Sequence, residues 1–589
     1  MPRDLPVGNG RLLLNFDKSY NLRDIYWPHV GQEIHTAGDI SHTGVWVDDQ
    51  FAWLDAPEWQ REMVYEKETL VTHVTLHHAG LQLQLIFRDC VDFYRAIFLR
   101  QIFVTNQADH PREVRLFFHY DWHILDTAQG NTVLYDPSEQ ALLAYRQQAY
   151  FLMNGQVGSG TNAHVGISSW ATGVKEFNGS EGTWRDAEDG VLGRNPIAQG
   201  SVDLYKRSLL VLRTQIDYNG AIIAANDADV EHFSRDSYSY MWPRDGALVA
   251  NALSHAGYSE ITRMFYDFCN AVLTPDGYLL HKYNPDRSWG SSWHPWMDRD
   301  GNPQLAIQED ETALVLYSLW QHYRVFDDVE FVAPHYRTLV TPAADFLASY
   351  REPHTRLPGP SYDLWEERLG ILTYTTSAVY AGLDAAANFS AIFGEEELAT
   401  KYRTAADEIK QATRRYLWDE ERGHFLRMIT VDKNGTIHKD ATLDSSLCGL
   451  FQFGMFQATD ELIERTMQQL ERTLWVKTQV GGMPRYENDY YYQVTHDLSQ
   501  AQGNPWFICT LWLAQYKIAC ASTIEELHEA LPLLEWALKH ALPSGVMAEQ
   551  VNPFTSEPLS VSPLTWSHAE FVLTVRWYIG KYHRFAPTG

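Results

Sequence analysis

The sequence has few of the features that mark secreted, membrane or metal-binding proteins. Only five of its 589 residues are cysteines, and these are scattered and match no metal-binding spacing. We expect them to be reduced, mostly buried thiols. No basic segment followed by an apolar run opens the chain, and no apolar stretch approaches the length of a transmembrane helix. These absences predict a cytoplasmic protein without a membrane partner.

Positive charge is also scarce. The chain carries 47 Lys and Arg against 75 Asp and Glu, which gives a net charge of −28. An acidic surface repels phosphate backbones, so a nucleic-acid partner is not expected. A neutral substrate is compatible with this charge, as is a surface that acts only in solubility. A homo-oligomer stays open.

Aromatic residues are abundant, with 20 Trp, 32 Tyr and 26 Phe. They suit a core, and they also suit pockets that stack on flat apolar faces. The length exceeds what one core usually supports, so we expect two domains.

The first 190 residues predict an antiparallel β-sandwich. Apolar residues alternate along 70–90, where two period-two runs are split by Ala79 and Gly80, a hairpin signature. The segments 95–106 and 112–122 continue the pattern without helical stretches between them. A polar, glycine-rich stretch follows, and we place a linker at 191–202.

Residues 203–589 predict an all-helical domain. Apolar residues recur three and four positions apart in about twelve segments, among them 336–350, 442–456 and 523–542. Every second connection is short, and the others are long and rich in Trp, Tyr, Gly, Pro and acids. If antiparallel helix pairs close into a ring, the long loops form one wall around one mouth, where function is expected.

Carboxylates stand out in these long loops. In SYDLWEERLG, Asp363 and Glu366 could begin a helix as a capping box, or Glu366 and Glu367 could act on a substrate. Asp245 in YMWPRDGA and Glu549 in VMAEQVNP lie in loops of the same class. Their convergence favours function over a helix cap.

Two carboxyl groups in different protonation states are what glycoside hydrolysis requires. We expect Trp365 and the like charge of Glu367 to raise the pKa of Glu366, as suits an acid. Arg244 and Asp245 form a donor–acceptor pair suited to adjacent sugar hydroxyls, or a simple salt bridge.

Tryptophans concentrate in the same loops. They could be core residues, but apolar sugar faces stack on such rings, which favours a sugar pocket. His294 and His496 match no two-histidine metal spacing, so neither a metal nor another cofactor is expected. The tryptophans in question are Trp242, Trp289, Trp293, Trp296 and Trp506.

A family resemblance becomes specific in the long loops and the helices that follow them. These contain, in order, the motifs MWPRDGALVANAL, QEDETALVLYSLW, SYDLWEERLG, GGMPRYE, QGNPWFICTLW, AEQVNP and LTWSHAEFV. With these motifs in the family's order, the chain from about 200 to 580 resembles glycoside hydrolase family 15, the glucoamylase family, and the first half resembles the β-sandwich of its prokaryotic members. The resemblance implies a multidomain protein with an N-terminal antiparallel β-sandwich followed by an (α/α)6 barrel.

The resemblance also implies an activity and residue roles. It implies an inverting, exo-acting hydrolase that releases β-glucose from non-reducing ends of malto- or isomalto-oligosaccharides or α-glucans. Glu366 resembles the general acid and Glu549 the base that activates water. The expected substrate contacts are Arg244, Asp245, Arg485, Trp242, Trp365, Glu367, Trp296 and Trp506.

Other functions remain open. A trehalase of the same family is the nearest, although RDIYWPHVGQE resembles glucoamylase-type members more closely. An inverting disaccharide phosphorylase would need no carboxylate base, which Glu549 argues against. A non-catalytic carbohydrate-binding protein would need neither glutamate. The long YENDYYYQVTHDLS insert leaves substrate length and linkage undecided.

Overall fold

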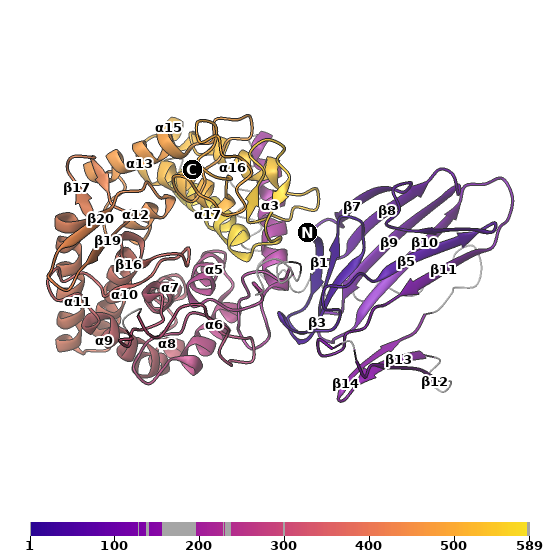
Figure 1. Cartoon of the computed structure of the whole chain (residues 1–589), viewed down its shortest axis with the longest axis horizontal. Helices are drawn as coiled ribbons and strands as arrows, with labels where there is room; N and C mark the ends of the chain where they lie inside the picture. Colours follow the sequence, from indigo (N-terminus) through magenta and orange to yellow (C-terminus); the bar gives the residue numbers. More distant parts are fainter. Residues whose placement is uncertain are drawn as a thin grey trace.

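The chain forms a β-rich lobe and a helical lobe that lie side by side (Figure 1). The computed structural model describes residues 2–127, 129–136, 141–155, 196–227, 229, 237–298 and 301–585. The strands of the first half occupy one lobe and the helices of the second half the other, which confirms the predicted order of the two folds.

The β-rich lobe is an antiparallel sandwich. One sheet has the order β1-β2-β3-β4 and another the order β10-β9-β8-β7. Leu5, Val7 and Phe16 of the first sheet share a core with Leu85 and Phe87 of the second. The strands are β1 (Arg3–Gly8), β2 (Leu13–Asp17), β3 (Leu22–His29), β4 (Gln32–Ile34), β7 (Gln60–Tyr65), β8 (Thr72–His78), β9 (Leu83–Val91) and β10 (Phe98–Asn106).

The hairpin predicted within 70–90 is confirmed, because β8 and β9 pair from His78 and Leu83 onward. Two smaller sheets, of order β11-β5-β6 and β12-β13-β14, complete the lobe. Their strands are β5 (His42–Val47), β6 (Gln50–Trp53), β11 (Val114–His119), β12 (Thr132–Asp136), β13 (Ala141–Arg146) and β14 (Ala149–Met153).

The helical lobe is a double ring, which confirms the expected (α/α)6 barrel. The inner ring closes because α5 packs on α7 and α17, α7 on α10, α10 on α12, and α14 on α17 and on the 3-10 turn Ser445–Cys448 that runs into α12. Its members are α5 (Pro243–His255), α7 (Glu309–Phe326), α10 (Thr373–Ile392), α12 (Gly449–Gln452), α14 (Phe507–Cys520) and α17 (Thr565–Phe585).

The outer ring lies behind the inner one. Its members are α3 (Pro196–Thr214), α6 (Ser259–Val272), α8 (Val329–His335) with α9 (Thr341–Ser349), α11 (Glu396–Ala412), α13 (Glu461–Leu474), and α15 (Ile524–His528) with α16 (Leu531–His540).

Burial distinguishes the two rings. In α14 every residue from Phe507 to Gln515 is buried, as expected for a helix surrounded by others. In α13 the buried residues are Ile463, Thr466, Met467, Leu470 and Leu474, which form one stripe.

Three predicted helices are not regular α-helices along their whole length. The segment 442–456 contains only a 3-10 turn, Ser445–Cys448, and the short α12. Gly454 has a φ of +76°, which is not a right-handed helical conformation, so the helix cannot continue past Phe453. Pro342 follows a π-helical turn, Tyr336–Val340, and Pro532 begins a new helix inside 523–542, because proline cannot donate an interior helical hydrogen bond.

The predicted linker is partly wrong. Residues 191–195 lie outside the described residues, but α3 begins at Pro196, so 196–202 are helical. A buried ion-pair network joins the two lobes, since Arg3 of β1 lies 3.0 Å from Asp229 and 3.3 Å from Asp227 in the loop before α5.

Candidate active site

The long loops that precede the inner helices meet at one end of the barrel. Trp242, Gln308 and Trp506 stand immediately before α5, α7 and α14. Backbone bridges tie these loops together, since Trp506 pairs with both Met483 and Gln550. Residues distant in the sequence are thereby brought to one place, as the alternation of short and long connections predicted.

The glutamates of SYDLWEERLG lie in the turn of a hairpin. The turn joins β15 (Ser361–Tyr362) to β16 (Leu369–Leu372). The Asp363 carboxylate accepts the backbone N–H groups of Glu367 at 2.7 Å and Arg368 at 3.0 Å. Glu366 has a φ of +64°, which is uncommon for a residue other than glycine. The capping-box interpretation is therefore wrong: Asp363 closes a tight turn that projects Glu366.

Buried charges support this hairpin from behind. Arg427 lies 2.8 Å from Asp363 and 3.1 Å from Asp444. The indole N–H of Trp365 donates to Asp444 at 3.0 Å. The turn and the tryptophan are thus fixed by the same arginine.

The helical lobe also contains several small strands besides β15 and β16. They are β17 (Trp418–Asp419), β18 (His424–Phe425), β19 (Met428–Val431), β20 (Ile437–Asp440), β21 (Gln550–Val551) and β22 (Pro558–Leu559), and a π-helical turn spans Thr413–Leu417.

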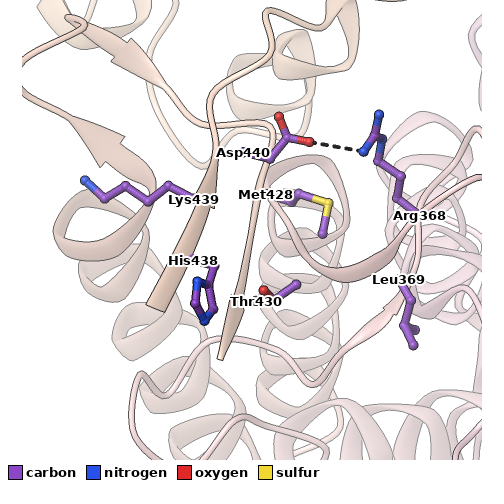
Figure 2. Close-up of a pocket in the computed structure, with 7 residues that line it drawn as sticks. All are labelled: Arg368, Leu369, Met428, Thr430, His438, Lys439 and Asp440. Carbon is purple, nitrogen blue, oxygen red and sulfur yellow. Dashed lines mark ion pairs between the residues drawn. The ribbon is translucent and has the colours of Figure 1, made fainter. Parts of the chain in front are cut away.

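A hollow of about 340 Å³ lies beside the hairpin on strands β16, β19 and β20. Arg368 forms one wall, and its guanidinium lies 3.7 Å from Asp440 (Figure 2). The residues predicted from the sequence to act on a substrate do not line this hollow. Its lining consists of Arg368, Leu369, Met428, Thr430, His438, Lys439 and Asp440.

Arg244 is the centre of one buried cluster. Its guanidinium lies 3.0 Å from Asp245, 3.4 Å from Glu311 and 3.7 Å from Asp310, and it donates to Gln308. Burial raises the pKa of Asp245, Arg244 opposes that shift and Glu366 adds to it. The predicted Arg244–Asp245 pair is therefore present, at the first turn of α5.

Arg485 is the centre of a second cluster. It forms two hydrogen bonds to Asp489, at 2.6 and 2.9 Å, and lies 2.9 Å from Glu367. The guanidinium lies 5.2 Å from the ring centres of both Trp365 and Trp506. This arrangement brings four of the predicted substrate contacts together.

Glu366 is surrounded by cations. Its Oε2 lies 3.1 Å from Nε2 of His281. Burial by itself would raise the pKa of Glu366, but His281, Arg244 and Lys282 together lower it to about 2. The expectation that Trp365 and Glu367 raise this pKa is therefore wrong, because the sequence did not reveal the cations that face the carboxylate.

Glu549 has the opposite environment. It is buried, and burial raises its pKa to about 7, against smaller opposing effects of Ser560, Gln550, Arg485 and Tyr238. The Gln550 side chain donates to Glu549 at 3.3 Å. The hydroxyl groups of Tyr238 and Tyr491 lie 2.6 Å apart, and the charge of Glu549 raises the pKa of both, after burial as the main cause.

The tryptophans divide into two groups. Trp242, Trp365 and Trp506 are buried, and the rings of Trp365 and Trp506 meet edge to face at 5.7 Å. Trp296 is 48% exposed. In the described part of the chain its ring makes no contact with the rings of the other predicted site residues. Trp293 from the same loop does reach the cluster, with its ring 5.1 Å from that of His281.

His281, His294 and Glu366 carry metal-ligating atoms within 4.8 Å of one another. The two imidazole rings are stacked, however, with their centres 4.2 Å apart and their planes inclined by 23°. Each nitrogen lone pair lies in its own ring plane, so the two rings do not direct their lone pairs at a common point. We assign no metal to this cluster.

Several residues of the site were missed from the sequence. His281 and Lys282 follow a turn that reads as an ordinary loop, and only the aromatic, glycine-rich stretch after them hinted at a function. Asp489 and Tyr491 lie in the insert whose role was left undecided, although the four-residue spacing of Arg485 and Asp489 could have suggested a pair. Tyr238 had no recognisable signal.

Comparison with known proteins agrees with this geometry. Residues 200–576 match the model of glycosyl hydrolases family 15, so the chain belongs to that family and is a glycosidase. A Methanocaldococcus jannaschii protein described as an uncharacterized glycosyl hydrolase is 26% identical over 97% of both chains.

Relatives with assigned activities cover less. A glucoamylase from a Clostridium species is 26% identical over 63% of this chain and 52% of its own length. Trehalase 2 of Sulfolobus acidocaldarius is 24% identical, with 63% and 62% covered. The structure of a bacterial glucoamylase complexed with acarbose shares the fold over 99% of this chain and 96% of its own, with a TM-score of 0.73 at 18% identity.

Among the residues that the structure describes, none of the helices combines the length and the apolar character that a membrane-spanning segment requires.

Proposed function

We propose that the protein is an inverting exo-α-glucosidase that releases β-D-glucose from the non-reducing ends of malto- or isomalto-oligosaccharides or α-glucans. In this proposal Glu366 protonates the glycosidic oxygen and Glu549 activates water. The observation that carries the proposal is that the buried Glu549 and the partly buried Glu366, which both act on the pKa of Tyr238, are held in opposite electrostatic environments beside two arginine–aspartate pairs. Such a pair of carboxyl groups is what this reaction needs.

The arginine clusters support exo action. Arg244 with Asp245 and Arg485 with Asp489 present donors and acceptors in fixed positions. A terminal glucose offers adjacent hydroxyls that such pairs can bind from two sides. Trp365 and Trp506 would supply the apolar walls of the same subsite.

The two pKa values alone would assign the roles the other way round, since Glu549 would hold the proton and Glu366 would be charged. We keep Glu366 as the acid for two reasons. Its place in DLWEER resembles that of the family's acid. In addition, the Trp242 indole N–H donates to Nε2 of His281, which disfavours a proton on that nitrogen. The charge of His281 is the main cause that lowers the pKa of Glu366, so this contact weakens the argument for the reversed roles.

A trehalase is the second candidate. Trehalase 2 of Sulfolobus acidocaldarius is nearly as similar as the clostridial glucoamylase, and both match about the same share of this chain. We favour glucans because the N-terminal segment resembles that of glucoamylase-type members. The five free, scattered cysteines, four of them buried, support a cytoplasmic location as part of the same proposal.

A substrate panel tests the proposal. Purified protein would be incubated with maltose, isomaltose, trehalose, soluble starch and dextran, with and without phosphate, and released glucose would be measured. We expect phosphate-independent release of glucose from at least one glucan or its oligosaccharides. Release from trehalose alone would establish the second candidate, and release only with phosphate would indicate a phosphorylase.

A further inference from the structure

The small sheet β11-β5-β6 of the β-rich lobe has one face in the core and one face in solvent. Residues opposite one another in an antiparallel sheet share a face, and neighbours along a strand alternate between faces. Val45 and Val47 of β5 belong to the core of the sandwich, and Ala52 and Leu116 pack against it. The residues between them on each strand therefore point outward. Figure 1 shows β5 and β11 in the part of this lobe that lies away from the barrel.

Aromatic rings cover the outward face. Gly44 at its centre pairs with Phe117 on one side and with Trp53 on the other. In the next row Phe51 pairs with Trp46. Phe51, Trp53 and Phe117 are 39 to 46% exposed, and the ring of Phe51 lies 4.8 Å from that of Trp53 and 5.6 Å from that of Phe117. We call these three residues the aromatic platform.

Gly44 keeps the platform continuous. A Cβ atom at this position would lie 2.4 Å from the ring of Phe51 and 3.0 Å from that of Trp53, so a side chain would push the two rings away. One ring is enough to cover a glycine in a sheet. Packing on Gly44 therefore does not account for three exposed rings.

The charged groups at the margins of the platform are paired with one another. These pairs favour neither an acidic nor a basic partner, but they still offer hydrogen-bond donors and acceptors beside the rings. An uncharged ligand with both apolar faces and hydroxyl groups fits such a surface. The pairs are Arg115 with Glu113 at 2.8 Å, His42 with Asp55 at 3.2 Å and Arg112 with Asp48 at 3.0 Å.

The area of the platform argues against a second copy of the chain as its occupant. An aromatic side chain buries about 150–250 Å², so three rings that are a little under half exposed offer roughly 300 Å². A stable protein interface needs about 800 Å² from each partner. Two copies with a net charge of −28 each also repel one another. Apolar patches of this smaller size on monomers are often functional.

We propose that the aromatic platform is an accessory binding site for a neutral α-glucan chain, separate from the active site. This inference rests on the proposed function, because the ligand is the class of polymer that the barrel would degrade. The sugar rings of the chain place their apolar C–H faces on the platform, and their hydroxyls meet the polar pairs at its margins. Binding at two places raises the effective concentration of the chain near the active site.

Glucan binding is measured first without turnover. Each protein carries Glu549→Gln, so that glucan is not degraded during the measurement. Native electrophoresis in gels that contain soluble starch or dextran gives a dissociation constant from the retardation of the protein. We expect Trp53→Ala and Phe117→Ala each to raise this constant about 5- to 10-fold for at least one glucan, as for the loss of one ring contact. Trp53→Tyr keeps an aromatic ring and should stay within about twofold of Trp53.

Phe118→Ala is the matched control. Phe118 follows Phe117 on β11, is 46% exposed against 44%, and points to the opposite face of the sheet. Its replacement should leave the retardation unchanged. Equal retardation of the Phe117→Ala, Phe118→Ala and parent proteins would overturn the inference. Sedimentation velocity tests the other occupant, since a dimer that Trp53→Ala converts to monomers would place a second copy on the platform and overturn the inference as well.

Kinetics on long and short substrates separate this inference from the proposed function. With Glu549 intact, Trp53→Ala should lower kcat/KM at least about threefold on the better of starch and dextran. On the disaccharide of the same linkage kcat/KM should not change, because a disaccharide cannot span two sites. An unchanged kcat/KM on the polymer would overturn the inference in an active enzyme. Retardation that depends on the platform, in a protein that releases no glucose from any glucan or its oligosaccharides, would overturn the proposed function alone.

Discussion

Glu367 and Arg485 come from different loops and meet as an ion pair, with 2.9 Å between Oε1 and Nη2. The contact joins the hairpin that carries Glu366 to the loop before α14. Tyr486 adds a second link, because its hydroxyl donates to Glu367 at 2.6 Å. Arg485 is thereby fixed between two tryptophan rings with its remaining donors on Asp489. The floor of the site is thus built before any substrate arrives.

Arg485→Lys should lower kcat/KM at least about 10²-fold. Lysine keeps the charge but cannot form the planar pair of hydrogen bonds to Asp489, and it leaves buried carboxylates under-satisfied. The matched control is Arg403→Lys, at the surface pair with Asp384, which should leave the kinetics unchanged. An Arg485→Lys enzyme with unmodified kcat/KM would remove this arginine from the substrate site.

Arg244→Ala should lose mostly kcat/KM and also lower the melting temperature. The residue balances Asp245, Asp310 and Glu311, and removing one partner from buried ion pairs costs about 3–5 kcal/mol. Steady-state kinetics and a thermal melt separate the two effects. A lower melting temperature with unchanged kinetics would make Arg244 a purely structural ion-pair residue.

Glu366→Gln should lower kcat on a glucoside at least about 10²-fold, because the amide cannot protonate the leaving oxygen. Hydrolysis of α-glucosyl fluoride should suffer much less. If the two substrates lose activity equally, Glu366 is not the acid, and the reversed roles suggested by the pKa values would have to be considered.

Glu549→Gln should change how stability depends on pH. The pKa of Glu549 is raised from 4.5 to about 7 by folding, so the native state holds more protons than the unfolded state between these values. Stability therefore falls as pH rises through this window. Replacing the glutamate removes a cost of about 3 kcal/mol above pH 7 and almost nothing at pH 4.

Urea denaturation at pH 4 and pH 8 measures this difference. The variant should gain stability relative to the unmodified protein only at pH 8. A gain of the same size at both values would mean that packing, and not the buried charge, separates the two proteins.

The sequence predicted the architecture because its signals are periodic and repeated. Alternation across 70–90 and the stripes of helices such as α13 follow directly from which faces are buried. The failures occur where one residue overrides the pattern. Pro532 divides one expected helix, and Gly454 with the Asp444 turn shortens another.

The site was predicted less completely, for a physical reason. Residue types indicated Glu366 and Glu549, but their pKa values depend on groups that only the fold brings near. His281 precedes Glu366 by 85 positions and still lies 3.1 Å from it. Local neighbours such as Trp365 therefore gave the wrong sign for the pKa of Glu366.

The stereochemistry of the first product tests the central claim most directly. If Glu549 activates water while Glu366 protonates the leaving oxygen, water attacks the sugar face opposite the leaving group, which requires carboxyl groups roughly 6.5–9.5 Å apart. Proton NMR of the anomeric signals during the first minutes of hydrolysis of the best α-glucoside should show β-glucose first, drifting later to the mutarotation mixture. Initial α-glucose would mean retention and would contradict both the role of Glu549 and the inverting mechanism.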